Sequence, residues 1–438
     1  MDPLIIGYAA VIALMVALFA GLPVGVGMGM IGVAGMYLSI GPQFVAGQLT
    51  TLPFAVTSNY AYAVLPLFVL MGMMAEAAGV TGEIFEATDR WLRRLRGGLF
   101  HAVIVGSTVF AAICGSTVVG AVVFTRLAFP EMMKRGYSRS ISLGCIAATG
   151  SFSAMIPPSI TMVIYAIVTE QSLGRLLVAG IMPGILTAIV YLTGMTLMVH
   201  LRPSIAPEPT SAVPLADRLR TVQWLWPVFV LIVLVLGGSY FGFFPPSAAG
   251  AVGVTGTFLI LLLRQRGRIP TSTWYLLVDA ASVSCILFTI LIGGLLFARM
   301  LVVAGVIDDF TQVISSTATS RTSFLIFAAI LYLILGCFLD TTSMMIVTLP
   351  FIFPVTQQLG IDGIWFGILL VKLVEIAVLT PPVGFNLFAV MSVVGPSVPY
   401  ADIAGGVLPF ILLELIVLTL LIAFPEISTW LPNTLLGR

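Results

Sequence analysis

Two double prolines inside long apolar runs place the strongest constraint on how this chain can fold. They occur in "MIPPSITMV" (155–163) and "LTPPVGFNL" (379–387). Proline removes a backbone donor and breaks a helix, so each run is predicted to be a helix interrupted midway. Small polar residues surround both breaks. The fold must therefore accommodate freed backbone groups and hydroxyls inside otherwise apolar segments.

The charged residues are too few to cover a water-facing surface. Only 8% of the 438 residues are charged and 59% are hydrophobic, whereas soluble domains carry about 25% charged residues. The chain is thus predicted to be an all-α polytopic membrane protein. A net charge of +1 without a basic tail gives no sign of nucleic-acid binding. The two histidines form no cluster and the four cysteines show no CxxC spacing, which argues against a metal or disulfide site.

Ten segments are long and apolar enough to span a bilayer, which takes about 20 residues. Five precede residue 201, near 3–20, 23–40, 60–79, 141–168 and 175–200. Five follow a polar segment rich in proline and charge, near 224–241, 245–263, 276–304, 362–395 and 401–424.

Two further apolar regions, about 98–133 and 322–358, are interrupted by the polar stretches "CGST" (114–117) and "LDTTS" (339–343). Each region is too long for one span. A polar centre predicts a re-entrant helical hairpin, whose irregular tip is tolerated only when buried in protein or facing water.

Basic loops set the predicted orientation. "RWLRRLRGG" (90–98) and "MKRGYSR" (133–139) bracket the first hairpin and are predicted to be cytoplasmic. The basic residues of 202–220 and 264–268 then fall on the same side. The second hairpin enters from the opposite face, and both termini are predicted to be periplasmic.

The spacing of these features repeats. Pro157 follows Pro130 by 27 residues (157 − 130), and Pro381 follows Pro354 by the same interval (381 − 354). The tips at Ser116 and Asp340 each lie 14 residues before the first proline of their half. We therefore predict two inverted repeats, 1–201 and 222–438, joined by a cytoplasmic linker at 202–221. Inverted repeats with broken helices are typical of secondary transporters, whose sites lie where the breaks meet.

Broken helices leave unpaired N–H groups that suit anions and unpaired carbonyls that suit cations. Each tip and its partner break offer both, which predicts two cation positions with an anionic substrate between the tips. Hydroxyls, carbonyls and at most one carboxylate favour a monovalent ion over Ca²⁺. The predicted substrate-binding residues are Ser116, Pro158, Ser159, Thr342, Pro382, Gly384 and Asn386. The alternative is that each Pro-Pro merely kinks a span while serines bond the freed carbonyls.

Other charged residues in the spans have separate interpretations. Asp340 is expected to coordinate an ion or to build the second tip, because carboxylates inside membranes are costly and usually functional. Lys372 and Glu375 lie three residues apart, so a local ion pair is favoured over a proton relay. Arg126 is expected to reach towards the cytoplasmic surface. Glu414 suggests no particular role.

Three long motifs resemble one transporter family. They are "FPEMMKRGYSRSISLG", "MIPPSITMVIYAIVTEQSLGRLLVAGIMPGIL" and "LDTTSMMIVTLPFIFPVTQQLGIDGIWFGILLVKLVEIAVLTPPVGFNLF". They resemble the large membrane (permease, DctM-like) subunit of tripartite ATP-independent periplasmic (TRAP) transporters, from the first spans to about residue 424. The resemblance implies Na⁺-coupled uptake of an organic acid across the bacterial inner membrane by an elevator-type motion. It also implies a periplasmic binding protein (DctP-like) and a small membrane subunit (DctQ-like), expected here as a separate chain.

The same resemblance implies ligands for two Na⁺ sites and no use of ATP. For the first site it implies Cys114, Gly115, Ser116, Thr117, Ser153, Ile156 and Pro157. For the second it implies Asp340, Thr341, Ala377, Thr380 and Pro381. Cys114 stands where the family usually has serine, and Ser153 and Ala377 stand where it usually has glycine.

Several alternatives stay open at this stage. A stand-alone anion symporter of the same architecture would need no binding protein. Proton coupling through Asp340, or through Lys372 and Glu375, would replace sodium. An intramembrane enzyme would need paired aspartates, Ser-His or a His-rich metal site within spans, and the sequence contains none. Substrates from C4-dicarboxylates, keto acids and sugar acids to sialic acid and zwitterions all fit the pattern.

Overall fold

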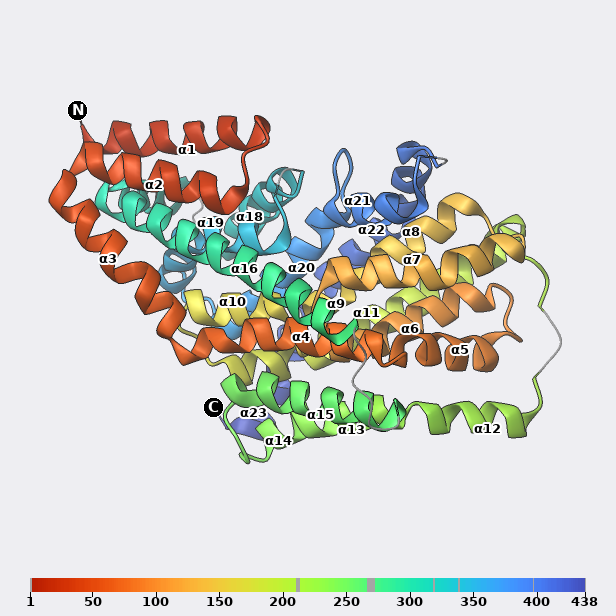
Figure 1. The fold of residues 1–438 in the computed structure, drawn as a ribbon. Coiled ribbons are helices and arrows are strands. Elements are labelled where there is room, and N and C mark those ends of the chain that lie inside the picture. Colours follow the sequence, from red (N-terminus) through yellow and green to blue (C-terminus); the bar gives the residue numbers. More distant parts are fainter. Residues whose placement is uncertain are drawn as a thin grey trace.

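The computed structural model describes residues 2–209, 213–265, 272–317, 320–337, 339–396 and 398–437. Across these ranges the chain forms helices joined by short turns, and no strand is found among them. The helices lie in a broad bundle, with α1 and α2 along one edge and α12 to α15 along the opposite one (Figure 1). The predicted basic loop at 264–268 lies mostly outside the described residues, as do 210–212 of the predicted linker.

The first half contains the first eleven α-helices and one short 3₁₀ turn, Tyr60–Ala63. The α-helices are α1 Pro3–Phe19, α2 Val24–Ser39, α3 Pro42–Ser58, α4 Val64–Ala77, α5 Val80–Leu92, α6 Gly98–Cys114, α7 Thr117–Lys134, α8 Arg139–Gly150, α9 Phe152–Met155, α10 Ile160–Val168 and α11 Leu173–Leu201.

The second half follows a short turn at Pro203–Ile205. Its elements are α12 Leu215–Trp224, α13 Trp226–Ile232, a π-helical turn Val233–Gly237, α14 Gly238–Tyr240, a 3₁₀ turn Pro246–Ala248, α15 Ala249–Arg264, α16 Ser272–Val303, α17 Val306–Thr317, α18 Arg321–Leu335, α19 Thr341–Gln358, α20 Gly363–Leu379, α21 Phe385–Val394, α22 Tyr400–Ala423 and α23 Glu426–Leu436.

Each predicted span coincides with one helix or with consecutive helices. Among the described residues, five helical segments are long and apolar enough to cross a membrane, or up to seven if two bent pairs each count as one. The helices α1 and α2, predicted as spans, have 17 and 16 residues. They lie near the lower limit of about 17 for a crossing helix.

The structure adds helices that the apolar pattern does not predict. The helix α12 begins at Leu215, inside the segment expected to be only a linker. The helices α3, α5, α17 and α23 lie between or after predicted spans. In α5 the buried positions Val80, Ile84 and Ala87 recur at helical spacing beside charged ones. Such amphipathic helices fall below a search for continuous apolar runs.

Contacts between helices follow a matched pattern in the two halves. In the first half α7 packs on α8, α8 on α22, and α21 on α7. In the second half α19 packs on α20, α20 on α11, and α10 on α19. Outside this group α2 packs along α16, and α4 along α15, as Figure 1 also shows for α2 and α16. The broken helices are thereby held between helices of both halves.

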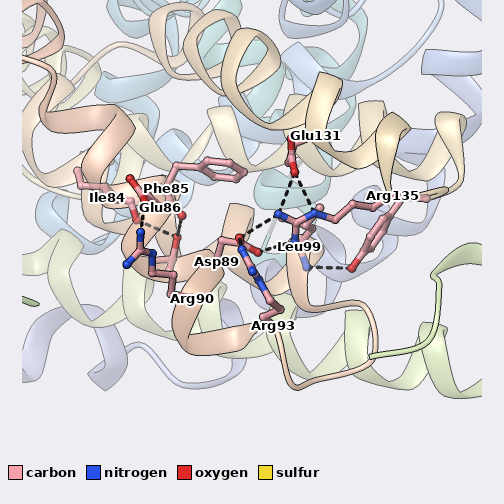
Figure 2. Close-up of polar contacts among 11 residues, drawn as sticks. Ile84, Phe85, Glu86, Asp89, Arg90, Arg93, Leu99, Glu131 and Arg135 are labelled. Atoms are coloured by element: carbon pink, nitrogen blue, oxygen red, sulfur yellow. Dashed lines mark hydrogen bonds and ion pairs between the residues drawn. The ribbon is translucent and has the colours of Figure 1, made fainter. Parts of the chain in front are cut away.

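An ion-pair cluster fastens α5 to the base of α7 (Figure 2). Arg135 donates to both carboxylate oxygens of Asp89, at 3.0 and 3.1 Å, and also to Glu131. Arg93 donates to Asp89 as well, and the Asp89 carboxylate is largely buried. Because a bidentate arginine–carboxylate pair fixes geometry as well as distance, the cluster makes α5 and the first hairpin one rigid unit.

Candidate functional site

The first tip is a tight turn between α6 and α7. Gly115 has φ of 63°, a left-handed conformation that glycine adopts without strain. A Cβ atom there would lie 2.8 Å from the carbonyl oxygen of Pro158, so the turn touches the first break directly. The Ile160 amide donates to the Gly115 carbonyl at 3.4 Å. Ser116 caps α7 by accepting from the Val119 amide at 3.5 Å.

The first break separates α9 from α10. Ile156 is extended, the bond between Pro157 and Pro158 is cis, and Ser159 starts the next helix. The Ser159 hydroxyl accepts from the Met162 amide at 3.2 Å and donates to the Ala154 carbonyl at 2.5 Å. One buried side chain thus satisfies groups on both sides of the break.

The second tip uses a carboxylate where the first uses a hydroxyl. Asp340 is the N-cap of α19 and accepts from the Thr342 amide at 3.0 Å. Its other carboxylate oxygen accepts from the Ser343 hydroxyl. Asp340 is therefore both a helix cap and the only charge at this tip.

The second break mirrors the first in its contacts. Thr380 ends α20 in an extended conformation, the bond between Pro381 and Pro382 is cis, and α21 begins after Gly384, whose φ is 62°. A Cβ atom on Gly336, at the end of α18, would lie 2.4 Å from the Cβ of Ala377. Each hairpin therefore packs its turn against the break of its own half.

A single cavity of about 850 Å³ brings the two tips together. Eight predicted site residues line it, four from the first tip, three from the second tip and one from α21: Cys114, Gly115, Ser116, Thr117, Asp340, Thr341, Thr342 and Asn386. The fully buried Asn386 amide donates to the Ala147 carbonyl at 3.3 Å, and its oxygen has no hydrogen-bond partner. That oxygen is a free acceptor at the cavity wall.

The remaining predicted site residues lie behind the tips and do not line this cavity: Ser153, Ile156, Pro157, Pro158, Ser159, Ala377, Thr380, Pro381, Pro382 and Gly384. Pro158 instead lines a second cavity of about 530 Å³ beside α11. Ser153 is buried near Gly120 of α7, where a Cβ would lie 3.5 Å from the serine oxygen. These residues reach a bound ion only through the narrow contacts between tip and break.

Other parts of the cavity wall were not assigned from sequence. Residues of α2 and α16 form one side, including Gly25 and Thr289. Glu76 of α4 and Arg126 of α7 also line it. Sequence reasoning directed Arg126 towards the membrane surface. The spacing of Val119, Val122 and Arg126 by three and four residues places them on one helix face, which is the available sequence signal.

Helix polarity divides the cavity region by charge. At the first tip α6 ends and α7 begins, and at the break α9 ends and α10 begins. The ends carry unpaired carbonyls and partial negative charge, and the starts carry unpaired amides and partial positive charge. The tip of α18 and α19 and the break of α20 and α21 repeat this arrangement. The site offers cation-binding and anion-binding groups side by side.

A buried ionic cluster lies away from the cavity wall. The Lys372 ammonium donates to Glu375, to Glu414 at 2.8 Å and to the Thr187 hydroxyl at 3.1 Å. The predicted pair of Lys372 and Glu375 is confirmed, and Glu414, for which the sequence suggested no role, is its third member. Tyr191 donates to Glu414 at 2.6 Å. All three charged side chains are fully buried, so the cluster joins α20, α22 and α11 through the core.

Comparisons with known proteins agree with this architecture. Residues 11–427 match the family described as "Tripartite ATP-independent periplasmic transporter, DctM component". The chain is 28% identical over 389 residues to the C4-dicarboxylate TRAP transporter large permease protein DctM of Pseudomonas aeruginosa, covering 87% of this chain and 88% of that protein. It is also 28% identical to the isethionate TRAP transporter permease protein DctMQ of Oleidesulfovibrio alaskensis, covering 97% of this chain and 65% of that longer protein.

Among solved structures, the chain is similar to the YdaH transporter of Alcanivorax borkumensis. The TM-score is 0.59 at 12% identity, and the match covers 88% of this chain and 90% of that one. At this identity the likeness concerns the fold alone.

Proposed function

This chain belongs to the DctM family of TRAP transporters as a multi-pass large permease subunit, and from that premise we propose that it carries an organic anion across the bacterial inner membrane, driven by Na⁺. The observation that carries the proposal is the cavity shared by both hairpin tips. A volume of about 850 Å³ lies within the 300–1,000 Å³ typical of small-molecule sites.

Relatives guide the substrate class. The two described above are named for a C4-dicarboxylate and for isethionate, which both carry an anionic group. The starts of α7 and α19 at the tips supply unpaired amides for such a group. We propose a carboxylate or sulfonate held between Thr117 and Thr342, with the free Asn386 oxygen accepting from a substrate hydroxyl or amide.

We propose Na⁺ sites behind each tip. The carbonyl ends of α6 and α9 would hold the first ion, with Ser116 at the cavity side. The carbonyl ends of α18 and α20 would hold the second ion, with Asp340 as its charged ligand. Contacts of Gly115 with Pro158 and of Gly336 with Ala377 support this, because they bring each tip within reach of its break. A hard monovalent cation suits such carbonyl and hydroxyl sets.

We also propose that the two halves are inverted repeats, 1–201 and 222–438, and that the hairpin-bearing helices move as one body. The matched contacts of α7 with α21 and of α19 with α10 support the repeat. The cavity wall is shared between the tips and the pair α2 and α16. A substrate between two such bodies would cross the membrane if one slid against the other, as in an elevator mechanism.

The proposed assembly follows from the family. A small membrane subunit, as a separate chain, and a periplasmic binding protein would complete the transporter, with both termini of this chain periplasmic and no ATP consumed. The longer relative is named DctMQ, and this chain matches 65% of it, which supports a second component beside the permease.

Uptake by the reconstituted transporter tests the proposal. The permease and its small subunit are placed in proteoliposomes, and the binding protein is loaded with the acid that stabilises it most in a thermal-shift screen. Uptake of that radiolabelled acid is expected under an inward Na⁺ gradient and should fall to background when K⁺ replaces Na⁺. Undiminished uptake without Na⁺ under a proton gradient would exclude sodium coupling. Uptake without any binding protein would instead indicate a stand-alone symporter.

A further inference from the structure

Arg126 is the only basic residue in the wall of the tip cavity described above. The other charged side chains there are Glu76 and Asp340. Arg126 lies nine residues after Thr117 on α7 (126 − 117), an axial rise of about 14 Å. Since helical side chains lean towards the helix start, its guanidinium lies closer to the tip than its backbone does.

The guanidinium has no partner in the described part of the chain. Arg126 is exposed and forms no hydrogen bond or ion pair with a described residue, Glu76 included. Arginines on neighbouring helices behave differently, because Arg93 and Arg135 pair with Asp89 and Arg264 pairs with Glu83. Charged groups within membrane proteins are normally paired, so a free guanidinium facing a cavity is available to a ligand.

Apolar side chains separate Arg126 from the tips. Along α7 the wall consists of Val118, Val119, Val122 and Val123. Opposite them lie Val69 and Met73 of α4 and Val283, Ile286, Leu287 and Ile290 of α16. A ligand spanning this stretch meets anion-binding groups at both ends and hydrocarbon between them.

We infer that Arg126 is a substrate-binding residue that selects organic dianions whose two acidic groups are separated by an apolar segment. The inference rests on the proposed function, which supplies the first anionic subsite at the tips. Arg126 supplies the second, within about 14 Å of the first. One acidic group alone would leave the guanidinium unpaired, so the dianion gains a charge-assisted contact that a monoanion of equal length lacks.

Binding to the purified complex of permease and small subunit tests this in Na⁺ buffer. The probes are adipate, suberate and the monomethyl ester of each, which keep the length and remove one charge. The wild-type complex should bind at least one diacid about 10- to 100-fold more tightly than its ester. Arg126→Gln should remove that preference by weakening only the diacid, and Arg126→Lys should restore part of it. Lys134→Gln, eight residues further along α7 and exposed, is the control and should keep the preference.

Equal binding of diacid and ester by the wild type would overturn the inference, as would a preference that survives in Arg126→Gln. If Arg126 serves the protein rather than a ligand, Arg126→Gln and Glu76→Gln should lower thermal stability equally without changing selectivity, which would also overturn it. Failure of every diacid to bind, while Na⁺ still stabilises the complex, would reject the dianion class and leave the proposed transport function standing. Loss of both responses would count against the proposed function itself.

Discussion

Replacing Asp340 with asparagine separates the two roles that its carboxylate has in the structure. The Thr342 amide and the Ser343 hydroxyl both donate to this side chain, which makes it a cap for α19. Asparagine caps a helix about as well as aspartate does, whereas alanine costs about 0.5–2 kcal/mol. Asp340→Asn should therefore leave thermal stability nearly unchanged, and Asp340→Ala should lower it measurably.

The charge has a different consequence. Two unit charges about 4 Å apart interact by about 4 kcal/mol at an effective dielectric constant of about 20. Part of that gain is offset when Na⁺ sheds water, so we expect the half-saturating Na⁺ concentration to rise by at least about tenfold in both variants. Uptake into proteoliposomes is measured against Na⁺ concentration, with choline holding ionic strength constant. A wild-type Na⁺ dependence in Asp340→Asn would refute the placement of a cation at the second tip.

Two further substitutions test the frame around the site. Gly115→Ala should reduce uptake strongly, because it meets both an unfavourable φ and a carbonyl oxygen at 2.8 Å. Gly136→Ala has a similar φ of 78° but no atom within 4 Å, so it should cost much less in the same uptake assay. Lys372→Met should lower the free energy of unfolding by about 3–5 kcal/mol, because it strands two buried carboxylates. Lys134→Met, whose side chain is 74% exposed, should change thermal stability little. Comparable losses within either pair would contradict the roles given to the first members.

Local features of this fold could be predicted because their causes are local. A proline pair breaks a helix wherever it lies, and Ser116 and Asp340 cap the helices that follow them. The pair of Lys372 and Glu375 follows from helical spacing. By contrast, Glu414 joins that pair from 42 residues away (414 − 372), through a packing of α22 on α20 that no local pattern encodes.

The cavity shows the same limit. Its tips could be predicted from two polar interruptions, but its opposite wall comes from α2 and α16, which read only as apolar spans. Arg126 alone suggests a side chain reaching for the membrane surface. Its place in the wall becomes visible only when α4 and α16 are set beside α7. Amphipathic helices such as α5 were missed because their apolar residues are spaced rather than continuous.

The proposed repeat has a further consequence for how a substrate lies in the cavity. Two halves related by an inverted axis would present equivalent groups from both sides, and a symmetric dianion could then bind either way round. The charges break that equivalence. With an offset of 224 residues between halves (354 − 130), the position equivalent to Arg126 is Pro350 (350 − 126), and the position equivalent to Asp340 is Ser116. One half thus supplies the guanidinium and the other supplies the carboxylate. Because the carboxylate would hold a cation at one tip while the guanidinium waits further along the other hairpin, a dianion meets only one orientation in which both of its ends are matched.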